Sequence, residues 1–481
     1  MTTSGPIARI ATAPVAFDTQ VDVLVVGAGA AGLTAALAAA DGGASVLLVE
    51  RDASPSGSTA LSSGLIPAPG TRWQRAANIE DSVALMVDDV MAKARGLTNR
   101  AYATRLVETA GPALEWLSDS HDVPFEVLQN FNYPGHSALR MHGHPDRTGR
   151  ALMHALLQAA NAAQLDIVTD ATVDTLVVDS KHRITGVTFS RPDGQSEGVG
   201  CAAVILACNG YGGNPALVRA HMPAMADALY FGHTGNQGHA IMWADALDLE
   251  CADLGAFQGH GSVASPHGIL ITWAVMMEGG VQINVAGERF SNEHAGYSEQ
   301  AANVLRQPRQ VAWNVYDGHC HAVAQQFEDY RDAEAMGAVI RAASLPKLAE
   351  ATRIPLASLQ RTFAQLDRSI SAGETDSFGR SFKDARRLDA PYYATKVTGA
   401  LFHTQGGLVV DADARALQVN GTPMPNLYAA GGAARGISGP SDWGYLSGNG
   451  LLSAISLGRI AGLHASGTPL PWKSTPLQSV Q

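Results

Sequence analysis

Cysteine is scarce in this sequence, and the four that occur stand far apart. Cys201, Cys208, Cys251 and Cys320 form no C-x-x-C pair. This spacing argues against a zinc site and against a dithiol redox centre. So few cysteines in a chain of 481 residues are typical of a protein from a reducing compartment.

Long hydrophobic runs and blocks of positive charge are also missing. No uncharged apolar run reaches the roughly 20 residues that a bilayer requires, and the N-terminus has no basic region followed by an apolar core. Lys and Arg total 33 against 44 Asp and Glu, a formal net charge of −11, and no Lys/Arg-rich block occurs. We therefore expect no membrane span, a cytoplasmic location and no nucleic acid as a partner.

Apolar residues and glycine are plentiful. Hydrophobic residues make up 46% of the chain and charged residues 16%, so a large core can form and disorder is excluded as the main state. The 50 glycines follow no G-X-Y period and predict tight turns and close backbone approaches. A chain of this length corresponds to about three domain-sized units.

A complete β-α-β unit opens the chain. Val21–Val26 is a continuous apolar run, typical of a strand buried on both faces of a parallel sheet. It leads into the G-x-G-x-x-G segment Gly27–Gly32, and a helix is expected from Leu33 to about Ala40. A second buried strand, Ala44–Val49, ends at Glu50.

This context predicts a dinucleotide site. The glycines permit a tight turn and close approach of a pyrophosphate, which the N-terminus of the following helix attracts. Glu50 is placed to accept hydrogen bonds from a ribose. The motif alone does not distinguish FAD from NAD, and a glycine-rich turn without a nucleotide is the alternative.

The remainder of the chain reads as mixed α/β. Helices are expected over 78–119 and 147–164, short alternating strands over 166–200, and a buried strand at 204–207. Strands broken by glycines are expected over 255–295, helices with loops over 310–390, a strand at 427–430, and a helix over 451–463.

Five further segments occur in a recognisable order, namely Ser58–Gly64, Val204–Gly212, Gly287–Glu293, His403–Leu408 and Asn426–Gly431. Together they resemble the fumarate reductase/succinate dehydrogenase flavoprotein superfamily, which includes the 3-ketosteroid dehydrogenases. The resemblance covers about residues 18–466. It implies an α/β fold in which a Rossmann-type FAD-binding domain, residues 18–254 and 401–468, carries an inserted α+β cap domain, residues 255–400, with the active site between them over the flavin.

The resemblance also implies the cofactor and its residues. Covalently flavinylated members carry a histidine where this chain has Ser58 and Thr59, so non-covalent FAD is expected. Members often place an acid where this chain has Gly432. No second G-x-G-x-x-G occurs, so the electron acceptor is expected to be external. The implied FAD-binding residues are Gly27, Gly29, Ala30, Ala31, Gly32, Glu50, Arg51, Ser58, Thr59, Ser63, Gly64, Ala207, Gly431, Gly432, Gly450, Leu451 and Leu452.

The substrate residues depart from the fumarate reductase pattern. Those enzymes bind a dicarboxylate with two histidines and two arginines. The histidines correspond to His260 and His403, whereas the arginine positions map to Tyr297 and Tyr445. The acid and arginine of the proton relay map to Trp273 and Met276. A dicarboxylate requires fixed positive charge, so this pattern argues against fumarate as the substrate.

The pattern is closer to the 3-ketosteroid dehydrogenases, which use tyrosines. Tyr297 and Tyr445 match two of these, and Tyr133 is a looser match for a third. The resemblance implies that a C=C bond is introduced beside a ketone. One phenol binds the carbonyl oxygen, a second removes the α-proton, and the β-hydride passes to flavin N5. We assign Tyr297 as base and Tyr445 as carbonyl donor, with His260 and His403 assisting.

Trp273, Trp443 and Arg140 are expected to line the substrate pocket. The substrate class stays open between a 3-ketosteroid, a smaller cyclic ketone and a cyclic keto-acid held by Arg140 or Arg435. A reductase of an activated alkene and a flavin-binding protein without chemistry are the alternatives. Half-buried structural tyrosines and histidines, and core tryptophans, would also fit the pattern. His142 and His144 lack further ligands, so no metal is expected.

Overall fold

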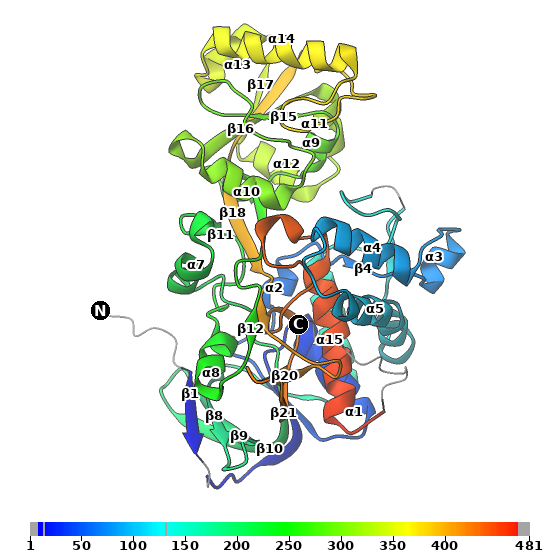
Figure 1. The fold of residues 1–481 in the computed structure, drawn as a ribbon, viewed down its shortest axis with the longest axis vertical. Coiled ribbons are helices and arrows are strands. Elements are labelled where there is room, and N and C mark those ends of the chain that lie inside the picture. Colours follow the sequence, from blue (N-terminus) through cyan, green and yellow to red (C-terminus); the bar gives the residue numbers. More distant parts are fainter. Residues whose placement is uncertain (1–7, 13–14, 130–131, 470–481) are drawn as a thin grey trace. The chain divides into compact units, whose positions relative to one another are not determined.

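The computed structural model describes residues 8–12, 15–129 and 132–469, and these form two compact units (Figure 1). Unit 1 contains the chain up to His221, Gly232–Phe257 and the chain from His403 onward. Unit 2 contains Met222–Phe231 and Gln258–Phe402. The sequence had placed Met222–Phe231 in the first part of the FAD-binding domain, whereas the structure places it with unit 2.

Unit 1 is built on a nine-stranded sheet with the order β1-β8-β9-β10-β2-β3-β7, in which β21 also pairs with β10, and β20 with β21. The strands β2, β3, β7, β10 and β21 pair in parallel. The C-terminal residues of β2, β10 and β21 and all of β3 are apolar and buried, as expected for strands covered on both faces. The bounds are β1 Arg9–Thr12, β2 Gln20–Val26, β3 Val46–Val49, β7 Asp166–Val168, β8 Thr172–Val178, β9 Ile184–Ser190, β10 Ser196–Leu206, β20 Arg415–Leu417 and β21 Pro423–Ala429.

Two helices of unit 1, α1 (Ala30–Asp41) and α15 (Asn449–Ala465), pack closely against each other. A Cβ added at Gly458 would lie 2.6 Å from Ala31 O, so glycine there permits the contact. The other helices are α2 Gly57–Ala60, α3 Arg72–Ala76, α4 Val83–Lys93, α5 Arg100–His121, α6 Gly149–Ala162, α7 Pro215–His221 and α8 His239–Leu247. Small sheets join β4 Ile66–Pro67, β5 Glu126–Val127 and β6 Met141–Gly143, and β12 Cys251–Ala252 with β19 Gly407–Leu408.

Unit 2 has a separate core around a seven-stranded sheet. Its order is β14-β13-β18-β16-β15, and β11 and β17 also pair with β18. The strands are β11 Leu229–Tyr230, β13 Phe257–Ala264, β14 Ile269–Leu270, β15 Val281–Ile283, β16 Val311–Asp317, β17 Val339–Ala342 and β18 Tyr392–Thr404. The helices are α9 Ala274–Met277, α10 Tyr297–Leu305, α11 Gly318–Ala324, α12 Glu328–Ala335, α13 Leu345–Thr352 and α14 Leu356–Ala372.

One expectation about secondary structure was wrong in part. The stretch 310–390 contains the buried strand β16 and the strand β17 as well as helices, because VAWNVYD supplies the alternating apolar residues of a strand. The helical stretch expected over 78–119 consists of two helices, α4 and α5, separated by a turn in which Gly96 has a φ of +74°.

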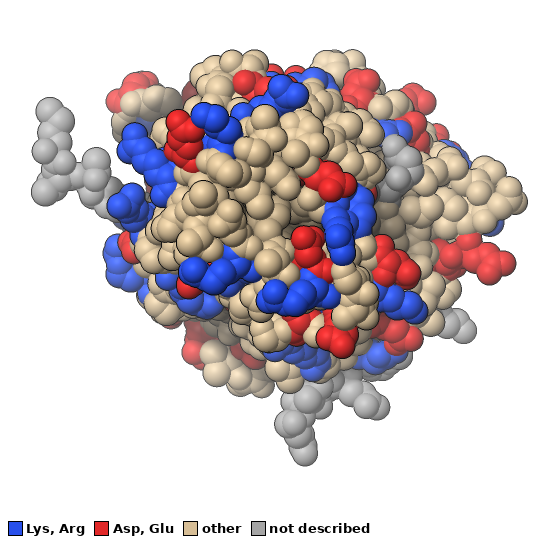
Figure 2. Space-filling view, turned by 90° about the horizontal axis from the view of Figure 1, so that it is seen from above, with Lys and Arg blue, Asp and Glu red and all other residues tan. Residues whose placement is uncertain are grey.

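No helix in the described ranges is long and apolar enough to cross a membrane. On the face that Figure 2 shows, basic and acidic side chains are interspersed rather than gathered into areas of one sign.

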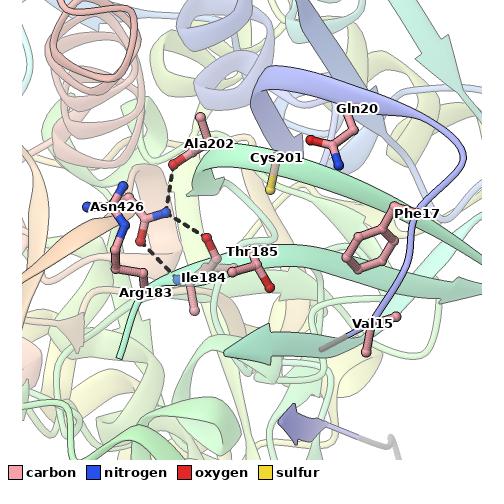
Figure 3. A pocket seen from close by; sticks show the side chains of 9 residues that line it. All are labelled: Val15, Phe17, Gln20, Arg183, Ile184, Thr185, Cys201, Ala202 and Asn426. Atoms are coloured by element: carbon pink, nitrogen blue, oxygen red, sulfur yellow. Dashed lines mark hydrogen bonds between the residues drawn. The ribbon is translucent and has the colours of Figure 1, made fainter. Parts of the chain in front are cut away.

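A surface pocket of about 280 Å³ lies where β9 and β10 meet the chain segment before β2 (Figure 3). Asn426, in β21, is buried beside it. Its amide accepts from Ile184 N at 3.0 Å and donates to Ile184 O at 2.7 Å and Ala202 O at 2.6 Å. One side chain therefore satisfies three backbone groups of two neighbouring strands.

Asn426→Ala should lower the free energy of unfolding by about 3 kcal/mol, because it leaves buried backbone groups without partners. Urea denaturation followed by tryptophan fluorescence measures the effect. Asn161→Ala, at an exposed position near the end of α6, is the control and should change stability by less than about 0.5 kcal/mol. Equal stability of the two variants would contradict the bridging role.

Candidate active site

The turn after β2 brings the backbone close to a neighbouring strand. Gly27 has a φ of +100°, and a Cβ there would lie 2.6 Å from Ala207 O. Only glycine fits such an approach at this φ. The predicted positions Gly27 and Ala207 are thus brought together where β2 and β10 end.

The N-terminus of α1 follows at once and offers backbone N–H groups. Its N-cap, Gly29, makes no side-chain cap, and Ala30 N–H donates to Thr59 Oγ1 at 3.1 Å. Ala31 and Gly32 are second and third in the helix, so their N–H groups have no partner within it. Such groups suit a phosphate.

Glu50 stands at the end of β3 beside this turn. Its Oε2 accepts from Ala28 N–H at 2.8 Å and its Oε1 from Asp52 N–H at 3.0 Å. The carboxylate is thereby fixed, and each oxygen keeps a further lone pair for a ribose hydroxyl. Arg51, predicted with it, instead pairs with Asp52 at 2.8 Å and approaches His233 Nδ1 at 3.3 Å.

The short helix α2 is held by two asparagines that the sequence analysis did not list as site residues. Asn209 Nδ2 and Asn236 Nδ2 lie 3.1 and 2.9 Å from Ser58 Oγ. Gly64 is buried, whereas the neighbouring Ser63 is exposed. Two side-chain amides thus meet one hydroxyl, and Asn209 belongs to the segment Val204–Gly212 that carries the family resemblance.

The C-terminal glycines meet the same unit. A Cβ added at Gly432 would lie 2.8 Å from His403 Nε2 and would collide with Asn209 Oδ1, so the imidazole and amide occupy the space of a side chain there. Gly431 begins a short 3₁₀ helix, and Gly450, Leu451 and Leu452 form the first turns of α15.

Two buried oxygens near the C-terminal glycines lack a partner in the described chain and suit a large polar cofactor. Within the residues that the structure describes, Thr404 Oγ1 and Asn449 Oδ1 are buried without a hydrogen-bond partner. Buried oxygens of this kind normally have a donor. Together with the glycine turn and the helix N-terminus, they fit FAD, whose pyrophosphate would lie at α1 and whose ribose would meet Glu50.

His403 lies at the start of the C-terminal segment of unit 1 and contacts a polar side chain. It is half-buried near the end of β18, and its Nδ1 lies 2.8 Å from Gln405 Nε2. Burial lowers the pKa of His403 to about 4, so the imidazole is neutral at physiological pH. A neutral ring can donate one hydrogen bond and accept another.

His260 lies in an aromatic cluster of unit 2. Its ring stacks on Tyr297 at 4.9 Å between centroids and meets Trp273 edge-on at 5.6 Å and Phe402 at 5.7 Å. Ser262 N–H donates to its Nδ1 at 3.2 Å, so the proton sits on Nε2. Burial lowers the pKa of His260 to about 3. The predicted residues His260, Tyr297 and Trp273 are therefore neighbours.

The other predicted tyrosines lie in unit 1. Tyr445 is buried after the 3₁₀ helix Asp442–Gly444, and its Oη accepts from Gly448 N–H at 3.3 Å. Tyr133 is half-buried, and burial raises its pKa to about 12, which opposes a phenolate there. Trp443 is covered by the Arg95 guanidinium, 4.4 Å from the ring centroid.

Arg140, predicted to line the substrate pocket, forms buried ion pairs. It is fully buried and donates through Nε to Asp81 at 3.0 Å and through Nη1 to Asp89 at 2.5 Å, while Nη2 reaches Asp81 at 2.9 Å. Two carboxylates thus neutralise its charge.

His142, one of the two histidines considered for a metal, forms hydrogen bonds with the Thr71 hydroxyl and with Arg140 O instead. No group of metal-binding residues occurs in the described ranges.

Comparison with known proteins supports an FAD-binding domain. Residues 22–451 match the FAD binding domain family. The chain is 29% identical to the probable fumarate reductase Ifc3 of Shewanella frigidimarina, across 92% of this chain and 74% of that protein. It is 26% identical to the urocanate reductase of Eggerthella lenta, across 94% and 76%.

Two solved structures share the fold. The open conformation of a flavocytochrome c3 fumarate reductase has a TM-score of 0.78 at 28% identity, covering 94% of this chain and 79% of that one. The 3-ketosteroid-Δ4-(5α)-dehydrogenase of Rhodococcus jostii RHA1, with 4-androstene-3,17-dione, has a TM-score of 0.76 at 24% identity, covering 96% and 99%.

The glycine turn and the matched family define an FAD-dependent oxidoreductase. The chain belongs to the FAD binding domain family, among flavoproteins related to the fumarate reductases. The expectation of FAD is confirmed, and its non-covalent attachment stays a prediction.

Gly27→Ala should weaken FAD binding more than tenfold, because the added Cβ would push β2 away from Ala207. Gly421→Ala is a matched control, since Gly421 also has a positive φ, +80°, but no atom within 4 Å of an added Cβ. Flavin fluorescence during titration of the apoproteins measures both dissociation constants. Wild-type affinity in Gly27→Ala would contradict the close-approach argument.

His260 should make the folded protein sensitive to mild acid. Its folded pKa of about 3 lies below the ordinary 6.5, so between these values the unfolded chain binds more protons and stability falls as the pH is lowered. From pH 7 to 5 the loss is about 2 kcal/mol for one such group. Urea denaturation should show a smaller loss in His260→Gln than in wild type or in the exposed control His267→Gln. Identical losses in all three would contradict the shifted pKa.

Proposed function

We propose that the protein is an FAD-dependent dehydrogenase that introduces a C=C bond beside the ketone of an uncharged cyclic substrate, a 3-ketosteroid or a smaller cyclic ketone. The observation that carries the proposal is the neutrality of the candidate substrate groups. Both histidines at the family positions have pKa values lowered by burial, and tyrosines stand at the arginine positions. Groups of this kind bind a neutral oxygen better than a dianion.

The nearby arginines support a neutral substrate, because carboxylates already neutralise them. Arg140 pairs with Asp81 and Asp89, and Arg435 Nε donates to Asp253 at 2.6 Å. The proposal therefore leaves out the cyclic keto-acid that either arginine was expected to hold.

Two arginines of unit 2, Arg289 and Arg380, also pair with carboxylates. Arg289 donates to Glu293 and Asp376, and Arg380 Nη1 lies 2.9 Å from Glu293. Glu293 is fully buried, and its carbonyl accepts from Trp273 Nε1 at 3.2 Å. This ion-pair cluster supports the backbone that carries the aromatic cluster, and its positive charges are balanced internally.

Each residue has a distinct role in the proposal. Tyr445 donates a hydrogen bond to the substrate carbonyl and so acidifies the adjacent C–H. Tyr297, as phenolate, accepts the α-proton, and its stacking on His260 fixes the ring. Bound FAD supplies the two-electron acceptor for the β-hydride, and an external acceptor then removes the electrons. Tyr133 is assigned no proton transfer, because its pKa is raised to about 12.

Reduction of an activated alkene is the second candidate, because the relatives Ifc3 and urocanate reductase are named as reductases. Anaerobic mixing separates the two. Under the proposal, cyclohexanone or a saturated 3-ketosteroid bleaches the oxidised flavin. Oxidation of only the reduced flavin, by fumarate or urocanate, would favour the reductase. A flavin spectrum unchanged by all of these compounds would point to a flavin-binding protein without this chemistry.

Tyr297→Phe and Tyr445→Phe should each slow flavin bleaching by the saturated ketone about 100-fold or more, because each removes a proton-transfer or carbonyl-binding hydroxyl. Stopped-flow absorbance at the flavin band gives the rates. Tyr392→Phe, which removes a hydroxyl at the first residue of β18, is the control and should stay within about threefold. Rates near wild type in both site variants would overturn the assigned roles.

A further inference from the structure

A chain of buried polar side chains ends at His403, entirely within unit 1. Asn449 Nδ2 donates to Ser438 Oγ at 3.4 Å, and Ser438 Oγ donates to Gln405 Oε1 at 3.0 Å. Gln405 Nε2 then lies 2.8 Å from His403 Nδ1. Asn449, Ser438 and Gln405 are each at most 3% exposed.

The direction of these bonds fixes the proton of the imidazole. Ser438 has one hydroxyl hydrogen, and Gln405 Oε1 receives it. The amide nitrogen of Gln405 only donates, so Nδ1 of His403 must accept. A neutral histidine carries one ring proton, and here that proton is on Nε2.

The backbone of Gln405 is held as firmly as its side chain. Gln405 N–H donates to Ala256 O at 2.8 Å, and Gly436 N–H donates to Gln405 O at 2.8 Å. The amide therefore has little freedom to turn away. His260 has the same arrangement, with Ser262 N–H at its Nδ1, so both histidines keep the proton on Nε2.

We propose that Gln405 is a positioning residue that holds His403 as the Nε2–H tautomer, and so presents His403 as a hydrogen-bond donor to a carbonyl oxygen. The tautomer follows from the hydrogen-bond chain alone, while the role toward a carbonyl rests on the proposed function. A donor at this point would bind a ketone oxygen and stabilise the negative charge that develops there.

The test is nitrogen NMR of the oxidised holoprotein labelled with ¹⁵N in the histidine rings. The bare and the protonated ring nitrogens have well-separated shifts, and His403→Gln identifies the signals of His403. The wild type should show a protonated Nε2 and a bare Nδ1. A protonated Nδ1 in the wild type would overturn the proposal, because the Gln405 amide would then face the other way.

Two substitutions separate the role of Gln405 from general packing. Gln405→Met keeps the length of the side chain but removes the donor, so His403 should populate both tautomers. Gln405→Glu places an acceptor at Nδ1, so Nδ1 should become protonated. Gln195→Met, at an exposed glutamine of the same unit, should leave the ring signals of His403 unchanged. A pure Nε2–H tautomer in both Gln405 variants would show that another group fixes the ring.

The kinetic consequence is measured separately. With a saturated cyclic ketone, Gln405→Met should lower kcat about tenfold or more with KM changed less than threefold, since the donor matters most as charge develops on the oxygen. If the NMR result holds but no ketone reduces the flavin, the proposed function fails and the tautomer assignment stands. If ketones react and the Gln405→Met rate equals wild type, the catalytic part of the inference fails.

Discussion

Burial of two imidazoles without a neighbouring carboxylate is the constraint on which the proposed function depends. His260 is buried and His403 half-buried, no carboxylate of the described residues stabilises the protonated form of either ring, and their pKa values fall to about 3 and about 4. The rings are therefore neutral, and each has a donor at Nδ1 that keeps its proton on Nε2. Under the proposed function, such neutral donors select a carbonyl oxygen by hydrogen bonding rather than by charge.

The surrounding scaffold keeps formal charge away from these groups. Several arginines near the functional segments pair with a carboxylate of the same unit, as Arg140 does with Asp81 and Arg289 with Glu293. These pairs satisfy the buried groups of both partners, and they position loops without presenting a free cation. At the cofactor site, in contrast, positive charge is left without a carboxylate partner among the described residues. Free backbone N–H groups at the start of α1 leave partial positive charge for an anionic pyrophosphate.

Local patterns predicted the β-α-β unit and the dinucleotide turn, because strand, glycine turn and helix are neighbours in the chain. The resemblance to known flavoproteins added the cofactor, and the mixture of helices and strands in unit 2 was only partly predicted. The strand β16 was missed where charged flanking segments suggested helices. Pairings such as Arg140 with Asp81, or Ser438 with Gln405, join residues far apart in sequence. No local pattern reveals which polar side chains share a buried network, so the ion pairs of Arg140 and the contact of Gln405 with His403 were not predicted.

The central claim is that the site accepts an uncharged carbonyl compound. The most direct measurement is equilibrium titration of the oxidised holoprotein at pH 7.5 with 2-cyclohexenone and with fumarate, followed by the visible absorption of the flavin. The account predicts saturable binding of the enone and affinity for fumarate at least about 100-fold weaker, which corresponds to roughly 2.7 kcal/mol for an uncompensated dianion. Tighter binding of fumarate than of the enone would contradict the account.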